Sequence, residues 1–193
     1  MKKIGVLSLQ GDVSEHVSSM EKAVEKMELD AFVEAVSSEE RLRDVDALVI
    51  PGGESTTLGK LIHMYGLAEV IMDLVKRDKP VMGTCAGMIL LASRVEDNKY
   101  ALDLMDVEVE RNAFGRQRES FEKDISIKGF RGKYHAVFIR APAIKRTWGV
   151  CELMAEVGGR GVMAKQGNLI VLSFHPELVH DTRVQELFLG LLD

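Results

Sequence analysis

Residues Lys79–Val95, KPVMGTCAGMILLASRV, contain a predicted strand, a sharp turn and a predicted helix. Pro80–Met82 is a short apolar run opened by a proline, which predicts a buried strand. Met88–Val95 is apolar, contains no helix breaker and predicts a helix. Between them lies Gly83-Thr84-Cys85-Ala86-Gly87, whose two glycines give the backbone the freedom to bend sharply.

The turn places the Cys85 thiol at the carboxyl end of a strand and beside the start of a helix. The first N–H groups of a helix have no intrahelical partner, and their positive pole stabilises a thiolate, which is the nucleophilic form of cysteine. The spacing G-x-C-x-G is that of a nucleophile elbow. A tight strand–helix turn that merely holds a buried cysteine is the alternative.

The residues before Lys79 alternate between strand and helix patterns. Predicted strands cover Lys3–Leu9, Asp30–Val36 and Asp46–Ile50; predicted helices run from Asp12 to about Met27, over Ser38–Arg43, and from the Pro51–Thr57 segment to Arg77, with an interruption at Gly66. Asp12 or Ser14 is expected to cap the first helix, and Glu15 completes a capping-box pattern with Asp12. This alternation predicts a largely parallel sheet with helices on both faces.

After Asp97 the predicted elements are strands. They are Leu104–Glu110, Ser120–Lys128, Tyr134–Arg140, Glu152–Val157, Gly161–Gln166 and Asn168–Phe174, followed by an amphipathic helix over Thr182–Leu192. Since no helix separates these strands, we expect them to be mostly antiparallel and to extend or cap the parallel sheet. No repeat or linker interrupts the chain. The prediction is a single α/β domain over residues 1–193, with a mixed, mostly parallel sheet in a three-layer, flavodoxin-like arrangement.

Composition excludes several classes of protein. Hydrophobic residues make up 46% and charged residues 28% of the chain, and the net charge is −5 without a basic block, so neither nucleic acid nor an anionic membrane is an expected partner. No apolar run is long enough to span a bilayer, and the cytoplasm is the expected location. The two cysteines form no C-x-x-C pair, which argues against a disulfide framework or a metal site; Cys151 is expected to be a packing residue.

Among the five histidines, His175 is the candidate base for Cys85. It ends an apolar strand, and Pro176 restricts it to extended backbone. Residues two apart in an extended segment project to the same side, so Glu177 is expected to hold one imidazole N–H while the other nitrogen faces the thiol. His16 and His63 fall in predicted helices and are expected to be surface residues. A strand end with a solvated histidine and glutamate is the alternative.

Backbone amides and arginines complete the candidate site. The N–H of Ala86 and a donor from the Gly52-Gly53 turn could stabilise a tetrahedral oxyanion. The loop Arg111–Gln117 and the strand end at Arg140 carry guanidinium groups that suit a carboxylate, or that pair with acidic neighbours. The segment Gly52–Thr56 lacks the lysine of a phosphate-binding loop, so phosphate is not an expected ligand.

Together these residues resemble the triad-type, class I glutamine amidotransferases, and more narrowly the glutaminase subunit of pyridoxal 5′-phosphate synthase. The matching segments, in order, are Leu9-Gln10-Gly11, Pro51-Gly52-Gly53-Glu54-Ser55-Thr56, Gly83-Thr84-Cys85-Ala86-Gly87, Arg111-Asn112-Ala113-Phe114-Gly115-Arg116-Gln117, Phe138-Ile139-Arg140-Ala141-Pro142 and Ser173-Phe174-His175-Pro176-Glu177-Leu178. The resemblance extends from Leu9 to the last helix.

The resemblance implies a role for each matching residue. Cys85, His175 and Glu177 would be the catalytic triad, and Gly53 and Ala86 the oxyanion donors. Glutamine would be bound by Gly53, Glu54, Ser55, Arg111, Ile139 and Arg140, whereas Gln10 would respond to the partner subunit.

The implied activity is hydrolysis of L-glutamine to glutamate and ammonia, without metal or organic cofactor, with ammonia passed to a docked synthase subunit for pyridoxal 5′-phosphate formation. The alternatives are a glutaminase subunit of another synthase, such as imidazole glycerol phosphate synthase, or a cysteine hydrolase of similar layout. A flavodoxin-like protein whose cysteine senses oxidants is the non-enzymatic alternative.

Overall fold

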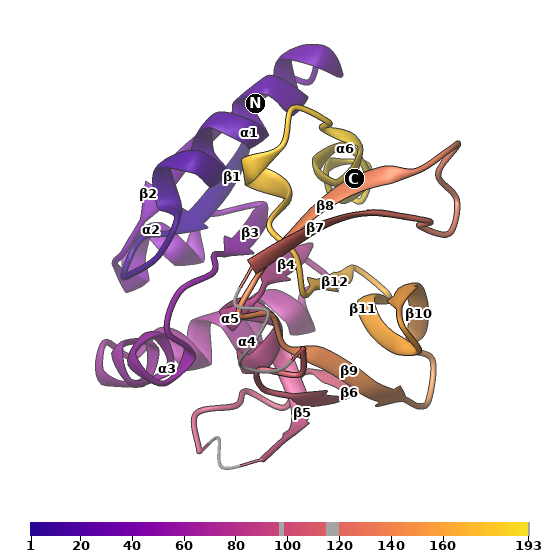
Figure 1. Cartoon of the computed structure of the whole chain (residues 1–193). Helices are drawn as coiled ribbons and strands as arrows, with labels where there is room; N and C mark the ends of the chain where they lie inside the picture. The colour runs from indigo at the N-terminus through magenta and orange to yellow at the C-terminus, as the bar shows by residue number, and fades with distance from the viewer. Residues whose placement is uncertain (97–98, 115–119, 193) are drawn as a thin grey trace.

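A computed structural model describes residues 1–96, 99–114 and 120–192 (Figure 1). The helices are α1 (Val13–Lys26), α2 (Glu39–Arg43), α3 (Ser55–Met64), α4 (Leu67–Lys76), α5 (Ala86–Leu91), the 3₁₀ helix η1 (Pro176–Leu178) and α6 (Arg183–Leu189). The strands are β1 (Lys2–Leu7), β2 (Ala31–Val36), β3 (Ala47–Ile50), β4 (Val81–Thr84), β5 (Ala92–Val95), β6 (Met105–Glu110), β7 (Ser120–Ile125), β8 (Tyr134–Ile139), β9 (Ala143–Thr147), β10 (Glu152–Val157), β11 (Arg160–Gln166) and β12 (Leu169–Leu172).

The first part of the main sheet is parallel, in the order β2-β1-β3-β4-β12. Strands β3, β4 and β12 are buried throughout, as expected for apolar strands covered on both faces. The predicted parallel core is therefore confirmed. Because β12 lies next to β4, its carboxyl end is adjacent to that of β4.

The second part of the sheet is mostly antiparallel. β11 pairs with β12, β9 and β10, and β6 pairs with β9, all antiparallel, whereas β5 lies parallel to β6 at the edge. The mixed sheet and its antiparallel C-terminal strands confirm the predicted fold class. β7 and β8 pair with each other in a separate two-stranded sheet.

Two predictions of local structure were wrong in this part. The helix predicted over Met88–Val95 ends at Leu91, and Ala92–Val95 form strand β5. Ala92 has extended backbone (φ −66°, ψ 145°) and pairs with Met105 of β6, so tertiary pairing overrides a weak helical preference. Strand β9 was not predicted, because Lys145 and Arg146 interrupt its apolar pattern.

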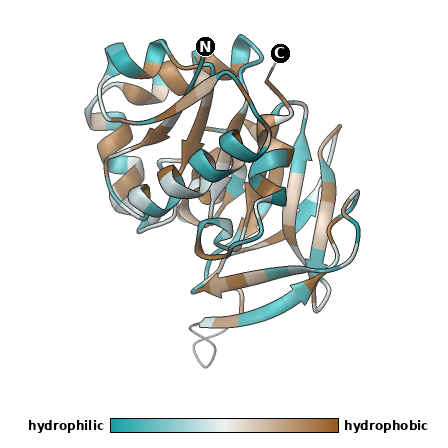
Figure 2. Cartoon of the chain, turned by 90° about the horizontal axis from the view of Figure 1, so that it is seen from above, coloured by the Kyte–Doolittle hydropathy of each residue, from teal (hydrophilic) through white to brown (hydrophobic). Residues whose placement is uncertain are grey.

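Three layers result from helices on both faces of the main sheet. One core cluster packs α2, α3, α4 and α5 against one face, and the other packs α1, α6 and the β7–β8 hairpin against the opposite face. Helices α1 and α6 lie side by side in Figure 1 and contact each other. In Figure 2 the central strands are largely brown, whereas the helices carry teal residues on their outer sides.

The chain breaks between α3 and α4 at Gly66, as predicted, because Gly66 adopts a left-handed conformation (φ 69°). The predicted cap of α1 was wrong. Asp12 occupies the N-cap position but its side chain makes no capping hydrogen bond, and the Ser14 hydroxyl donates to Glu15 instead. The Asp12 carboxylate is thereby available to the site described below.

In the part of the chain that the structure describes, no helix combines the length and the apolar character needed to cross a bilayer.

Candidate active site

Cys85 is the single residue between strand β4 and helix α5, and it is held in a strained conformation. Its φ of 48° and ψ of −98° lie outside the regions that a non-glycine residue ordinarily adopts. Such strain persists only where the surrounding structure enforces it, and it is concentrated at functional sites. The Cys85 N–H donates to the carbonyl of Leu172 in β12 (2.8 Å), which ties the turn to the neighbouring strand.

The glycines on either side of Cys85 are required by close backbone packing. A Cβ atom on Gly87 would lie 2.3 Å from the carbonyl oxygen of Ile50, and one on Gly83 would lie 2.6 Å from the carbonyl carbon of Gly87. Neither contact can be relieved by moving a flexible side chain. The G-x-C-x-G pattern is therefore a packing requirement of this turn, and it brings α5 against β3 and β4.

His175 approaches Cys85 from the end of β12, the strand that pairs with β4. Its backbone N–H donates to Val137 of β8 (2.9 Å), so the β7–β8 hairpin supports this segment. Its Nδ1 lies 2.6 Å from Oε1 of Glu177, whose side chain is fully buried. The structure thus places the imidazole and the carboxylate together, but the extended backbone expected from His175 to Glu177 was wrong: Glu177 reaches the ring from the 3₁₀ helix η1, which begins at Pro176.

Electrostatics around His175 favour the imidazolium form. Burial opposes the charge, but the Cys85 thiolate and the Glu177 carboxylate together raise the pKa of His175 to about 10. Nδ1 faces Glu177, whereas Nε2 is buried and makes no well-aligned hydrogen bond within the described residues. A proton held on Nε2 near the Cys85 sulfur is suited to transfer to a leaving group.

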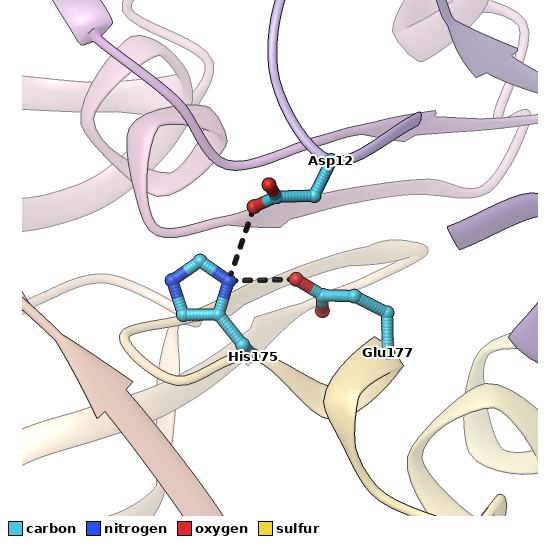
Figure 3. Close-up of side chains that lie close together, drawn as sticks. All are labelled: Asp12, His175 and Glu177. Carbon is cyan, nitrogen blue, oxygen red and sulfur yellow. Dashed lines mark hydrogen bonds and ion pairs between the residues drawn. The ribbon is translucent and has the colours of Figure 1, made fainter. Parts of the chain in front are cut away.

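Asp12 is a second carboxylate beside the same ring nitrogen. Its Oδ2 lies 3.5 Å from Nδ1 of His175, and Figure 3 shows Asp12 and Glu177 approaching this atom from different sides. These three residues are the one His/Cys/Asp/Glu group among the described residues with ligand atoms close enough for a metal ion. The short hydrogen bond to Glu177 indicates that Nδ1 is protonated, and a protonated nitrogen is not a metal ligand.

A cavity of about 430 Å³ opens in front of Cys85 and His175. That volume falls within the usual range for small-molecule sites. Its lining combines the two reactive side chains with most of the residues that the sequence singled out: Gln10, Gly53, Glu54, Ser55, Arg111, Ile139 and Arg140. Asp12, Ile89, Asn112 and Pro142 complete it.

Glu54 is the N-cap of α3 and carries a fixed negative charge. Its carboxylate accepts the N–H groups of Thr56 (2.9 Å) and Thr57 (2.6 Å). Partial burial acts against ionisation, but these hydrogen bonds outweigh it and lower the pKa of Glu54 to about 2. The Arg111 guanidinium lies 3.7 Å from the same carboxylate, so opposite charges face each other at the cavity wall.

Gln10 lies against the glycine turn that was expected to supply an oxyanion donor. Its Oε1 accepts the backbone N–H of Glu54 (3.0 Å). A Cβ on Gly53 would lie 2.5 Å from that Oε1, and Gly53 has a φ of 140° that favours glycine. The other expected donor, Ala86, is the first residue of α5 and follows Cys85 directly.

Of the three arginines in the predicted binding segments, the structure describes Arg111 and Arg140. Arg111 lines the cavity, and Arg140 lines it from a left-handed conformation (φ 42°) at the end of β8, next to the half-exposed Ile139. Gly115, Arg116 and Gln117 of the predicted arginine-rich loop lie outside the described residues.

Sequence reasoning missed the role of His16 and the contact between Gly52 and His175. The expectation that His16 is a surface residue was wrong: it is fully buried, and its Nε2 lies 3.3 Å from Oε2 of Glu177. His63, given the same expectation, is exposed. A Cβ on Gly52 would lie 2.8 Å from Cε1 of His175, so this glycine makes room for the imidazole. The spacing of His16 with the buried Met20 and Ala23 on one face of α1 was the signal that could have identified it.

Comparisons with known proteins agree with this geometry. Residues 6–192 match the model of the SNO glutamine amidotransferase family. The chain is 52% identical over 190 residues to "Pyridoxal 5′-phosphate synthase subunit PdxT" of Actinobacillus pleuropneumoniae serotype 5b (strain L20), covering 98% of this chain and 95% of that protein. It is 46% identical over 189 residues to the protein of the same name from Methanothermobacter thermautotrophicus, covering 98% and 96%.

A solved structure described as a glutamine amidotransferase superposes with a TM-score of 0.87 at 41% identity, covering 98% of both chains. Sequence and fold therefore agree over nearly the whole chain, and the protein belongs to the SNO glutamine amidotransferase family.

Proposed function

We propose that this protein is the glutaminase subunit of a pyridoxal 5′-phosphate synthase, hydrolysing L-glutamine with Cys85, His175 and Glu177 and supplying the ammonia to a synthase subunit. The observation that carries the proposal is the convergence of Cys85 and His175 on one cavity in a chain that is 52% identical to a pyridoxal 5′-phosphate synthase subunit. Membership of the SNO family favours this function over a glutaminase of another synthase or a general cysteine hydrolase.

In the first step the Cys85 thiolate attacks the carbon of the glutamine side-chain amide. The C=O bond opens to an oxyanion, which the N–H groups of Ala86 and Gly53 would stabilise. The C–N bond then breaks, and the nitrogen takes the proton from Nε2 of His175 and leaves as ammonia. The product is a γ-glutamyl thioester on Cys85.

In the second step water hydrolyses this thioester. Neutral His175 takes a proton from the water as its oxygen attacks the carbonyl carbon, and the C–S bond breaks to release glutamate and the Cys85 thiolate. This proton transfer returns His175 to the protonated form that it had before the first step. Glu177 orients the imidazole through Nδ1 and stabilises its positive charge in both steps.

Charges on the cavity wall suit the zwitterionic end of glutamine. The Glu54 carboxylate would attract the α-ammonium group, and Arg111 and Arg140 would attract the α-carboxylate. Ser55 and Ile139 line the same wall and would bound the chain of the substrate. Charged groups of both signs suit a zwitterionic amino acid better than a neutral peptide backbone.

Gln10 is the proposed contact between partner docking and catalysis. Its side chain is bonded to the N–H of Glu54 and packed against Gly53, so a partner that moved Gln10 would change how the Gly53–Glu54 backbone presents its donors. The synthase subunit is thus proposed as both the acceptor of ammonia and the activator of the glutaminase. We propose the cytoplasm as the site of the reaction, as the sequence predicts.

The test is to measure glutamine hydrolysis with and without the synthase subunit of a pyridoxal 5′-phosphate synthase. Cys85→Ser is expected to abolish ammonia release without losing docking, because the hydroxyl is a far weaker nucleophile than a thiolate. Cys151→Ser is the matched control. Burial raises the pKa of the Cys151 thiol to about 11, so it is protonated near neutral pH, and its replacement should leave the activity nearly unchanged. Full activity of Cys85→Ser would overturn the proposed function.

A further inference from the structure

A second histidine, His16 of α1, lies close to the Glu177 oxygen that does not face His175. Its Oε1 accepts from His175, whereas its Oε2 lies 3.3 Å from Nε2 of His16, which points inward from α1. Both the His16 ring and the Glu177 side chain are fully buried. Oε2 makes no hydrogen bond of good geometry within the described residues, so its 3.3 Å contact with Nε2 of His16 is an electrostatic one.

The protonation of His16 follows from its surroundings. Burial lowers the pKa of His16 more strongly than the Glu177 carboxylate raises it, so the ring is neutral and carries one N–H. Nε2 faces two oxygens, those of Glu177 and of Thr84 (3.1 Å), whereas Nδ1 has no hydrogen-bonding partner within the described residues. A lone pair on Nε2 would repel the carboxylate, so the proton belongs on Nε2.

Nε2 of His16 also joins both parts of the site. Thr84 immediately precedes Cys85 in the elbow, and Glu177 orients the base that acts on it. The Nε2–H donates to Thr84, and its electrostatic contact with Oε2 favours one position of the carboxylate relative to the turn that carries the nucleophile. Without the contact to His16, the buried Oε2 would lose a positively polarised neighbour, and the carboxylate would be more costly to keep ionised.

We propose that His16 is a positioning residue for glutamine hydrolysis: its Nε2–H holds the Glu177 carboxylate in the orientation that aligns His175 with Cys85. This inference rests on the proposed function. His16 does not itself line the substrate cavity, and its contact with the lining residue Asp12 is a backbone hydrogen bond of helix α1; the contacts of its ring with the site are those with Glu177 and Thr84.

The test compares His16→Leu, which removes the donor, with His16→Gln, whose amide N–H can reach a similar position. We expect His16→Leu to lower kcat by roughly 10- to 100-fold with KM changed by less than about 2-fold. The loss should be smaller than the ~10⁴-fold that follows when the carboxylate of such a triad is neutralised. His16→Gln should recover most of kcat. His63→Leu, a substitution of an exposed histidine, is the matched control.

A spectroscopic measurement separates positioning from general packing. The proton in the 2.6 Å hydrogen bond between His175 and Glu177 should give a far-downfield NMR signal in the free protein. We expect this signal to shift or disappear in His16→Leu and to return in His16→Gln. If His16→Leu does not fold, His16→Met takes its place, because a flexible thioether fills irregular core space.

Two results would overturn the inference. One is an apolar variant with unchanged kcat and an unchanged His175 signal. The other is equal loss of activity in the apolar and glutamine variants with that signal in place, which would assign His16 a packing role only. Cys85→Ser in the same assay tests the proposed function separately: if it is inactive while His16→Leu is fully active, only the role of His16 is rejected.

Discussion

The ionised side chains of the site are fixed by backbone donors and buried partners. Glu54 is held by two N–H groups of α3, and His175 by a carboxylate that solvent does not reach. Charges fixed in this way need little rearrangement when a substrate binds or when charge develops in the reaction, which is the basis of electrostatic catalysis. The cavity is therefore preorganised at the level of single side chains.

Glu54 gives a pH-dependence that can be checked at one residue. The pKa of Glu54 in the folded protein is about 2, below its ordinary value of 4.5, so its ionisation stabilises the fold above pH 4.5 and this contribution is lost as the pH falls toward 2. Because the side chain is about half exposed, solvent screening makes the effect modest.

We expect Glu54→Gln to have a lower Tm than the unsubstituted protein at pH 7, and the difference to shrink between pH 5 and pH 3. Thermal unfolding over this range measures it. Glu25→Gln, at an exposed position of α1, is the control and should behave like the unsubstituted protein. A difference in Tm that is constant with pH would contradict the assignment. The same variant should raise KM for glutamine, because the cavity wall loses its fixed negative charge.

At the scale of elements, the site is built where two neighbouring parallel strands end. β4 delivers Cys85 and β12 delivers His175, and they meet because the two strands pair in register from Val81–Leu169 to Thr84–Leu172. Loops at the carboxyl ends of β1 and β3 bring Gln10 and Gly53 to the same edge. The short helix α5 can follow Cys85 directly only because its first turn lies against β3.

Gly87→Ala tests this packing. The added methyl group would lie 2.3 Å from the Ile50 carbonyl oxygen, so α5 must move away from β3, and we expect a loss of about 1–3 kcal/mol in the free energy of unfolding. Glutaminase activity should fall by more than the loss of folded protein accounts for, since Cys85 moves with α5. Gly190→Ala, where the nearest atom is 3.3 Å away, is the control for the same change of residue. Similar stability of both variants in urea unfolding would show that α5 is not held as tightly as described.

At the scale of the whole molecule, aromatic side chains and backbone hydrogen bonds join the β7–β8 hairpin to the rest of the protein, and one of these hydrogen bonds reaches the site. Phe138 is fully buried, stacks on Phe121 (4.6 Å between ring centroids) and contacts Phe174, the residue before His175. Val137 accepts the His175 N–H. The hairpin therefore belongs to the same packed body as the triad, although within the described residues β7 and β8 pair only with each other.

Phe138→Ala should lower the stability of the entire protein. Loss of a fully buried phenylalanine costs about 3–5 kcal/mol, and we expect one cooperative transition at a lower urea midpoint, together with reduced activity at urea concentrations below that midpoint. Phe138→Leu should lose much less. If the hairpin unfolded on its own and left the main transition unchanged, this interpretation would be wrong. The organisation of residues 1–193 as a single domain stays a prediction, which such a single transition would support.

The sequence by itself determined the α/β class and the elbow around Cys85, because both depend on local spacing: glycines two residues from a cysteine, and apolar runs separated by turns. The family followed from the resemblance of its matching segments to known proteins. The sequence also predicted that Glu177 meets His175, although Glu177 lies in the 3₁₀ helix η1 and not in an extended segment. Only the tertiary structure decided that Ala92–Val95 form a strand, that Asp12 faces His175 rather than capping α1, and that His16 is buried against Glu177. These features depend on which distant segments meet. A helical preference, a capping pattern or a histidine on a helix has no fixed outcome until the neighbouring strand, carboxylate or hydroxyl is in place.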